Sequence, residues 1–262
     1  MAAIPPLVPL FEGVLAPYEP VLRLPDPNSH SQARPATDLL HPSTLNEVMA
    51  QYWPNCQHQD PRALLSIWSQ FYFLRLLPPV LAANLIMDWS LSLALDGMSV
   101  VIGGNGLPVA FVLPDEGTPL GVGVSVQTRF QVLSEQHMAP LIRAWSCQTG
   151  LSERVFWGNA GRYIDWLLTQ FQELGQPSQV WAPLQDWLNL PEDWNGERNP
   201  LYQLYRYCPG SNREPPHRVR RTCCIRYRLS GISLCSDCPR SCRCQRSPLE
   251  IAGGVRQSRP FY

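Results

Sequence analysis

Six of the nine cysteines in this chain lie between Cys223 and Cys244. Such clustering indicates a bound metal, an iron–sulfur cluster or disulfides, each of which fixes the path of the chain around it. The N-terminus lacks basic residues and contains Pro5, Pro6 and Pro9, so it is not typical of a secretory signal. We therefore expect a cytosolic protein, in which structural disulfides are rare.

The spacing of the first four cysteines narrows the choice. Cys223 and Cys224 are adjacent, ten residues separate them from Cys235, and Cys238 follows two residues later. The Cys235–Cys238 pair is a general thiolate clamp that suits zinc or iron–sulfur. Adjacent cysteines suit two irons, or one iron if the backbone bends. Spacing alone leaves iron–sulfur, zinc and free redox-active thiols open, whereas a vicinal disulfide is disfavoured by its distorted peptide bond.

The other cysteines carry a weaker signal. Cys242 and Cys244 follow closely, and we interpret them as extra thiols that could also replace a ligand or bind a second metal. Cys56, Cys147 and Cys208 are isolated in the sequence. We expect these three to be buried as small apolar side chains.

The basic residues divide the chain by charge. All 21 are arginine, and without lysine the chain can form neither a Walker A phosphate loop nor a pyridoxal Schiff base. Residues 1–207 hold 10 arginines and 18 acidic residues, whereas residues 208–262 hold 11 arginines and 3 acidic residues. The basic tail could bind nucleic acid, an anionic membrane, an acidic partner or the body itself, or it could surround an anionic prosthetic group.

The pattern predicts an α+β fold, mostly helical, with a small antiparallel hairpin and a cysteine-rich C-terminal segment. We divide the chain into a loosely structured, proline-rich arm over residues 1–40, a body over 41–207 and a basic segment over 208–262. The apolar run 64–87 is interrupted by polar residues and Pro78-Pro79, so we expect two antiparallel core helices joined by a sharp turn rather than a membrane span.

Several further elements are expected in the body. A capping box at Thr44–Glu47 predicts a helix through Tyr52, and Pro61 predicts the start of another. Gly103-Gly104-Asn105-Gly106 predicts a hairpin turn rather than a phosphate loop. The remaining expectations are strands at 98–102, 109–113 and 121–130, and helices at 131–149, 153–174 and 179–190.

The segment RVRRTCCIRYRLSGISLCSDC (218–238) resembles the C-terminal signature of the FhuF family of ferric-siderophore reductases. That signature is Cys-Cys-x10-Cys-x2-Cys, with an Arg-Arg pair before it and an Arg-Tyr-Arg-Leu stretch after the first two cysteines. Weaker similarity covers LLSIWSQFYFLRLLPPVLAANL (64–85), VFWGNAGRYIDWLL (155–168) and Asn199-Pro200-Leu201. Together the resemblance covers residues 60–240.

The resemblance implies a [2Fe–2S] cluster ligated by Cys223, Cys224, Cys235 and Cys238. It further implies an enzyme that reduces a ferric siderophore, expected to be of the hydroxamate type, by one electron and releases Fe²⁺ for iron assimilation. We find no dinucleotide fingerprint, so an unidentified external donor is expected, and no nucleic-acid partner. The expected location is the cytoplasm, and a peripheral association with the cytoplasmic face of the inner membrane stays open.

Two groups of residues are candidates for supporting roles. Arginines flank the ligands and are expected to favour the more anionic, reduced cluster: Arg220, Arg221, Arg226, Arg228, Arg240 and Arg243. Candidates for the substrate surface are Trp68, Tyr72, Trp157, Asn159, Tyr163 and Trp166, although aromatic residues at helical spacing are usually core. The alternative function is a non-enzymatic binding module, stabilised by zinc or a cluster, with an arginine-rich tail.

Overall fold

The most apolar run of the sequence forms the central helix of the molecule. The structure is a computed structural model that describes residues 2–26, 33–54, 58–209 and 216–242, and in it helix α2 spans Pro61–Ile86. The Asp60 carboxylate caps this helix by accepting the backbone N–H of Arg62 at 3.1 Å. Pro61 occupies the first turn, where its missing N–H is not needed, so this predicted helix start is confirmed.

Helix α2 does not stop at Pro78-Pro79, and the predicted turn between two antiparallel helices is wrong. Both prolines lie inside the helix and are buried, as are Leu76, Leu77 and Val80 around them. Proline weakens a helix by removing backbone hydrogen bonds and crowding the preceding turn. Burial of apolar side chains on every face of α2 outweighs that local cost, because packing supplies most of a helix's stability in a protein.

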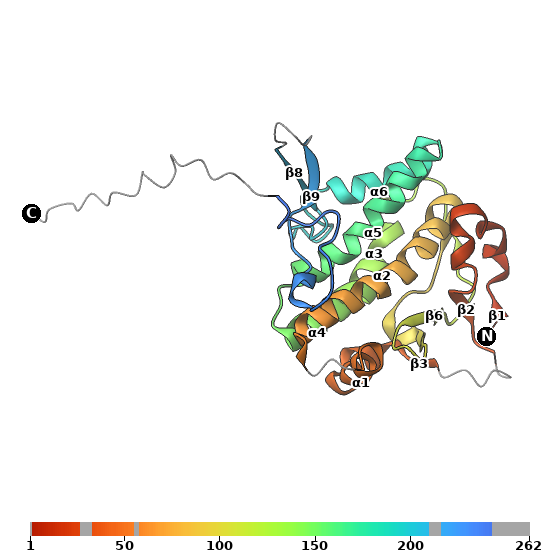
Figure 1. The fold of residues 1–262 in the computed structure, drawn as a ribbon. Coiled ribbons are helices and arrows are strands. Elements are labelled where there is room, and N and C mark those ends of the chain that lie inside the picture. Colours follow the sequence, from red (N-terminus) through yellow and green to blue (C-terminus); the bar gives the residue numbers. More distant parts are fainter. Residues whose placement is uncertain (1, 27–32, 55–57, 210–215, 243–262) are drawn as a thin grey trace, which may run out of the picture.

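Other helices surround α2, and α5 makes the most extensive contact along it (Figure 1). The helices are α1 (Pro42–Tyr52), α3 (Val126–Gln131), α4 (Ala139–Thr149), α5 (Glu153–Glu173) and α6 (Ser178–Asn189). A π-helical segment, η6 (Val132–Met138), joins α3 to α4. Four expected helices are thus confirmed to within a few residues. The strand predicted at 121–130 is wrong, because helix α3 begins within this stretch, where Ser125 caps it by accepting the backbone N–H of Thr128.

A five-stranded sheet packs beside the helices in the order β1-β2-β6-β5-β3. Its strands are β1 (Ala2–Ala3), β2 (Leu22–Leu24), β3 (Ala33–Pro35), β5 (Ser99–Ile102) and β6 (Pro108–Val112). The β5–β6 hairpin confirms the predicted turn, and Gly106 in it has φ 72°, where a Cβ would lie 2.4 Å from the backbone nitrogen of Tyr52. Two small antiparallel pairs complete the sheets: β4 (Trp89–Ser90) with β7 (Thr118–Pro119), and β8 (Tyr205–Cys208) with β9 (His217–Arg220).

The described part of residues 1–40 is integral to the core rather than a loose arm. Strand β2 pairs in parallel with β6, and the short 3-10 helices η1 (Pro5–Leu10), η2 (Gly13–Tyr18) and η3 (Ala36–Leu40) contribute buried residues to the main core. Apolar side chains between the prolines explain this, since 3-10 turns tolerate proline that a longer helix would not. The capping box predicted at Thr44–Glu47 is also wrong. Helix α1 starts before it, at Pro42, and the Glu47 carboxylate pairs with Arg34 at 3.0 Å instead of capping the helix.

Helix α2 is long and apolar enough to cross a membrane by length and composition alone. However, 83% of its most apolar 18-residue window is buried inside the molecule. The helix contacts α5, α4 and the sheet instead of a lipid phase. Its sequence signature is therefore that of a core helix, as the sequence analysis predicted.

A buried histidine makes the fold sensitive to pH. His137 donates through Nδ1 to Leu93 O at 2.9 Å, its neutral Nε2 therefore accepts from Tyr72 Oη at 2.8 Å, and burial lowers its pKa to about 4. The unfolded chain, with a histidine pKa of about 6.5, therefore binds this proton first as the pH falls. The contribution of His137 to the free energy of unfolding is fully present above about pH 6.5. It is lost progressively as the pH falls towards 4, by about 3 kcal/mol in total.

Denaturant unfolding between pH 7 and pH 5.5 tests this expectation in wild type and His137→Gln. The variant should be less stable at pH 7, because Tyr72 loses its partner, but its stability should fall less steeply with acid. The difference between the two pH profiles isolates His137 from other titrating groups. Parallel profiles would contradict the assignment.

Two glycines on α5 give a matched pair for measuring how closely the 201–204 segment packs. A Cβ on Gly161 would lie 2.5 Å and 2.8 Å from the δ carbons of Leu204, whereas a Cβ on Gly158 would meet only Thr222 Cβ at 3.8 Å. Both alanine variants gain about 1 kcal/mol of helix propensity. We expect Gly158→Ala to be stabilising and Gly161→Ala to be about 1–3 kcal/mol less stable than Gly158→Ala, because it overpacks the contact. Equal melting of the two variants in thermal unfolding would show that Leu204 moves aside freely.

Candidate metal centre

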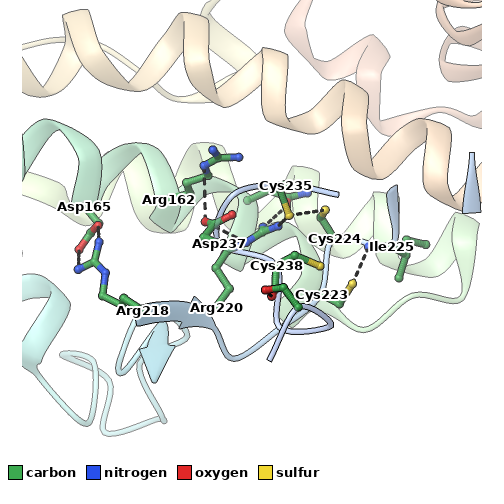
Figure 2. A network of polar contacts seen from close by, with 12 residues as sticks. Arg162, Asp165, Arg218, Arg220, Cys223, Cys224, Ile225, Cys235, Asp237 and Cys238 are labelled. Atoms are coloured by element: carbon green, nitrogen blue, oxygen red, sulfur yellow. Dashed lines mark hydrogen bonds and ion pairs between the residues drawn. The ribbon is translucent and has the colours of Figure 1, made fainter. Parts of the chain in front are cut away.

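The four predicted ligands meet in the loop that follows β9. Cys224, Cys235 and Cys238 form a buried cluster with side-chain exposures of 1%, 6% and 1%, and Cys223 is half-buried. The sulfurs of Cys224 and Cys235 lie 3.9 Å apart. Figure 2 shows the four cysteines near one another around this loop, with Arg220 beside Cys235. All four are free thiols, so the expectation that Cys223 and Cys224 form no vicinal disulfide is confirmed.

A backbone bend directly after the adjacent pair places an N–H donor at the first of its two sulfurs. Ile225 has φ 54°, in the left-handed region that β-branched residues rarely adopt. Its N–H donates to Cys223 Sγ at 3.3 Å. Strain of this kind costs about 1–3 kcal/mol and persists where the surroundings impose it. Here it gives Cys223 a backbone donor, which stabilises an anionic sulfur.

Arg220, the last residue of β9, places a buried positive charge beside the sulfurs. Its side chain is 2% exposed, and its Nη2 donates to Cys235 Sγ at 3.1 Å. Its Nε lies 3.2 Å from Asp237 Oδ2, an ion-pair distance without hydrogen-bond alignment. Arg162 of α5 approaches the same carboxylate at 3.7 Å (Figure 2). Because a buried guanidinium needs nearby negative charge, this environment suits thiolates and an anionic cofactor.

Among the thiols near Arg220, the pKa of Cys224 is shifted towards the thiolate form that binds metals, whereas the pKa values of Cys235 and Cys223 are shifted the other way. Contact with Cys235, aided by the Arg220 guanidinium, lowers the pKa of Cys224 to about 5 despite burial. The same contact, together with burial, raises the pKa of Cys235. Burial also raises the pKa of Cys223. The Cys224–Cys235 pair therefore holds one thiolate at neutral pH and gives up its second proton much less readily.

A polar connection fixes the cysteine loop to the helical body. Ser66 of α2 donates through Oγ to the backbone oxygen of Cys224 at 2.8 Å. Asn159 of α5 donates to Ser66 O at 2.8 Å and to Ser69 Oγ at 3.0 Å, while its Oδ1 accepts from Arg220 Nη1 at 3.2 Å. Asn159, which the sequence placed among substrate candidates, is therefore a positioning residue. Two buried serines in an otherwise apolar helix were the signal for this role.

Contacts of residues other than the four cysteines also hold the loop against the body. Leu229 packs into an apolar cluster with Leu64 and Ile67 of α2, and Arg228 pairs with Asp60 at 2.9 Å. Arg218 of β9 forms an ion pair with Asp165 of α5. Most of the flanking arginines thus have structural partners, and within the described residues only Arg220 is shown donating to a sulfur of the four predicted ligands. Arg243 lies outside the described residues.

One prediction about the remaining cysteines is wrong. Cys208 of β8 and Cys242 form a disulfide, although Cys208 was expected as an isolated buried residue and Cys242 as a spare thiol. The β8–β9 hairpin brings these residues together across 34 positions, with their Cα atoms 5.7 Å apart. The closed loop contains all four predicted ligands. Cys147 is exposed rather than buried, and Cys56 and Cys244 lie outside the described residues.

The aromatic candidates for substrate binding separate into two groups. Trp68 and Tyr72 are fully buried in the main core, where Trp68 donates to Gly106 O, so they cannot contact a substrate. Tyr163 and Trp166 pack against the same core while partly exposed. Trp157 lines a cavity beside the cysteine loop. The sequence could not separate these roles, because all five aromatic residues lie at helical spacing in apolar segments.

The donor set fits a two-iron cluster. Three buried cysteines, a half-buried fourth, a backbone donor and one buried guanidinium together favour a sulfur-ligated anionic group. Among the residues that the structure describes, no three His, Cys, Asp or Glu side chains converge closely enough to hold one metal ion. Because a [2Fe–2S] core shares four thiolates between two irons, its ligands need not converge on a single point.

A buried cysteine loop on a helical body defines a class of protein: an oxidoreductase with an iron–sulfur segment at its C-terminus. Residues 66–212 match the family described as ferric iron reductase FhuF-like transporter, and residues 220–240 match the FhuF 2Fe-2S C-terminal domain. The chain belongs to this family. It is also 26% identical over 203 residues to the ferric siderophore reductase of Escherichia coli (strain K12), covering 75% of each chain.

These comparisons confirm the family and the enzyme class predicted from the sequence, and the structure confirms the α+β class. The chain is an oxidoreductase that acts on iron, and its cofactor is a [2Fe–2S] cluster. The zinc alternative receives no support from the C-terminal match. Assignment of the four individual ligands rests on the geometry above and is part of the proposal that follows.

Proposed function

We propose that this protein reduces the iron of a ferric hydroxamate siderophore by one electron, with Cys223, Cys224, Cys235 and Cys238 as the ligands of its [2Fe–2S] cluster. The observation that carries the proposal is the buried Cys224, Cys235 and Cys238 cluster beside Arg220, in the segment that matches the 2Fe-2S domain. When bound, the cluster would supply a one-electron carrier. The relative from Escherichia coli, named ferric siderophore reductase, supports the choice of substrate.

The proposed reaction requires the protein mainly to position the ferric complex near the cluster. One electron converts the bound Fe³⁺ to Fe²⁺, which the hard oxygen ligands of a siderophore hold far more weakly, so Fe²⁺ leaves without cleavage of the siderophore. Each ~59 mV between donor and acceptor changes a one-electron equilibrium tenfold. Arg220 helps by placing positive charge at Cys235, which favours the more negative, reduced state. An external reductant returns one electron per turnover.

The proposal includes a cytoplasmic location, where reductants are plentiful. The burial of α2 supports it, because the most apolar helix is occupied by core packing. The Cys208–Cys242 disulfide is unusual for that compartment. Cell fractionation decides between soluble and membrane-bound protein, and recovery of the chain only in the membrane pellet after a salt wash would contradict this part of the proposal.

The test is an anaerobic spectroscopic cycle on the purified holoprotein. Visible and paramagnetic-resonance spectra are recorded before dithionite, after dithionite, and after addition of a ferric trihydroxamate with a ferrous-specific chelator. We expect bleaching, then recovery of the oxidised spectrum with one Fe²⁺ released per cluster. The redox-inert Ga³⁺ complex of the same siderophore is the control and should leave the reduced spectrum unchanged. A cluster that reduces without ever being reoxidised by the ferric complex would refute the proposed reaction.

A further inference from the structure

A cavity of about 850 Å³ adjoins the cysteine loop. One wall is formed by Arg220, Arg221 and Thr222, which directly precede Cys223. Trp157 and Gly158 of α5 also line it, and Gly158 lies directly beside Thr222, where a Cβ would be 3.8 Å from Thr222 Cβ. The cavity therefore reaches the residue that directly precedes the first predicted ligand.

The size and lining of the cavity suit a small metal chelate. Its volume falls in the range of about 300–1,000 Å³ that is typical of small-molecule sites. The segment between α6 and β8 closes it, and Glu135 fixes that segment by accepting from Trp194 Nε1 at 2.6 Å and Asn195 Nδ2 at 2.5 Å. The outer walls are thus held in place by hydrogen bonds without any bound molecule.

The charges around the cavity select among iron chelates. Five arginines and four carboxylates line it, so its own charge is nearly balanced. The neighbouring [2Fe–2S] cluster, dianionic when oxidised and trianionic when reduced, makes the surroundings net negative. Three singly charged hydroxamates neutralise Fe³⁺, whereas three doubly charged catecholates leave a trianionic complex that this site repels.

Three arginines on the cavity wall can act as donors to a chelate. Arg143, Arg154 and Arg198 are solvent-exposed and line the cavity. Within the described part of the chain, none of the three forms an ion pair. Their guanidinium groups can therefore donate to the oxygens of an iron complex without giving up an existing partner.

A second cavity of about 830 Å³ provides the comparison. It lies between α1, the start of α2 and the end of α4, where Met49, Ala50 and Leu64 contribute to its lining. No described residue of the cysteine segment lines it, although Asp60 and Leu64 of its lining contact Arg228 and Leu229. Arg220, which lines the first cavity, instead donates to Cys235 Sγ at 3.1 Å, so the first cavity has the more direct connection to a predicted ligand.

The geometry points to this cavity, which is lined by Thr222, Trp157 and Gly158, as the site that binds the ferric siderophore for reduction, with a preference for neutral trihydroxamate complexes over tricatecholate ones. This inference rests on the proposed function and adds where the substrate lies. It assigns Arg143, Arg154 and Arg198 as substrate-binding residues. It also explains why the cysteine loop is fixed so firmly to α5, since the loop forms part of the binding wall.

Two matched substitutions test the assignment by binding rather than turnover. Ala139→Trp fills the proposed site and Ala50→Trp fills the second cavity; both alanines lie on helices and line cavities of similar volume. Calorimetric titration of the holoprotein with a Ga³⁺ trihydroxamate avoids electron transfer. We expect Ala139→Trp to weaken binding at least ~10-fold and Ala50→Trp to leave it unchanged. A Ga³⁺ tricatecholate should bind the wild type more weakly than the trihydroxamate.

A charge variant covers the case in which Ala139→Trp does not fold. Arg154→Glu combined with Arg198→Glu changes exposed side chains only, and it should weaken binding of the trihydroxamate several-fold. Wild-type affinity in both folded site variants would overturn the assignment while leaving the proposed reaction intact. If instead the wild type binds no chelate and its reduced cluster is not reoxidised by any ferric complex, the proposed function itself fails.

Discussion

Replacing Cys235 with serine is expected to abolish the [2Fe–2S] cluster. The Cys235 sulfur is at the centre of the site, 3.9 Å from Cys224 Sγ and 3.1 Å from Arg220 Nη2, and it is almost fully buried. A serine hydroxyl is shorter, ionises far less readily than a thiol and is a poor ligand for iron in this setting. After anaerobic reconstitution, iron content and visible absorption should both drop to background.

Cys147→Ser is the matched control for this experiment. Cys147 is also a free thiol, but it is exposed on α4, away from the cysteine loop. The control should reconstitute to the same iron content as the wild type. A normal cluster in Cys235→Ser would instead mean that another residue, such as Cys244, completes the ligand set, and the assignment of Cys235 would have to be abandoned.

Replacing Arg220 with glutamine is expected to weaken both the fold and the reduced state of the cluster. The change leaves Asp237 without its nearest partner and leaves Asn159 Oδ1 without a donor. Breaking a buried ion pair costs about 3–5 kcal/mol, and we expect the lower end because Arg162 remains 3.7 Å from Asp237. Loss of a positive charge at Cys235 should lower the midpoint potential by on the order of 60 mV, a tenfold change in equilibrium.

Two further variants separate charge from stability. Arg221→Gln changes the neighbouring exposed arginine and should stay within about 0.5 kcal/mol of the wild type. Combining Arg220→Gln with Asp237→Asn removes the unpaired carboxylate and should recover part of the stability. Anaerobic denaturant unfolding and a potentiometric titration followed by paramagnetic resonance provide the two readouts. If Arg221→Gln lowers the potential as much as Arg220→Gln, the effect comes from general charge rather than from the contact with sulfur.

The helical elements could be predicted largely from local sequence. Regular apolar spacing defined α5 and α6 to within a residue or two, and Pro61 marked the start of α2. The failures occurred where tertiary packing outweighs local preference. Pro78-Pro79 is a strong break signal in an isolated chain, yet surrounding side chains keep that stretch helical. The described part of residues 1–40 joins the core through pairing with β6, a partner almost 90 residues away that no local pattern reveals.

The candidate site also combines features that local sequence predicts with features that depend on tertiary packing. The cysteine spacing and its resemblance to a family predicted the ligands, because that information is contained in a short segment. The roles of Ser66 and Asn159 depend on how α2, α5 and the loop meet, so the sequence showed only that polar residues lay in apolar helices. The Cys208–Cys242 disulfide was missed because no strand was predicted over residues 205–220, where the β8–β9 hairpin brings the two cysteines together.

The hydrogen bond from Ser66 to Cys224 joins residues 158 positions apart in the chain. During synthesis the anchor on α2 leaves the ribosome long before the cysteines do, and N-terminal regions generally fold first. The helical body is therefore available as a template when the last segment emerges, and iron–sulfur delivery becomes the final step of biogenesis. The order of synthesis thus provides the part of the body that positions Cys224 before the cysteines themselves are made.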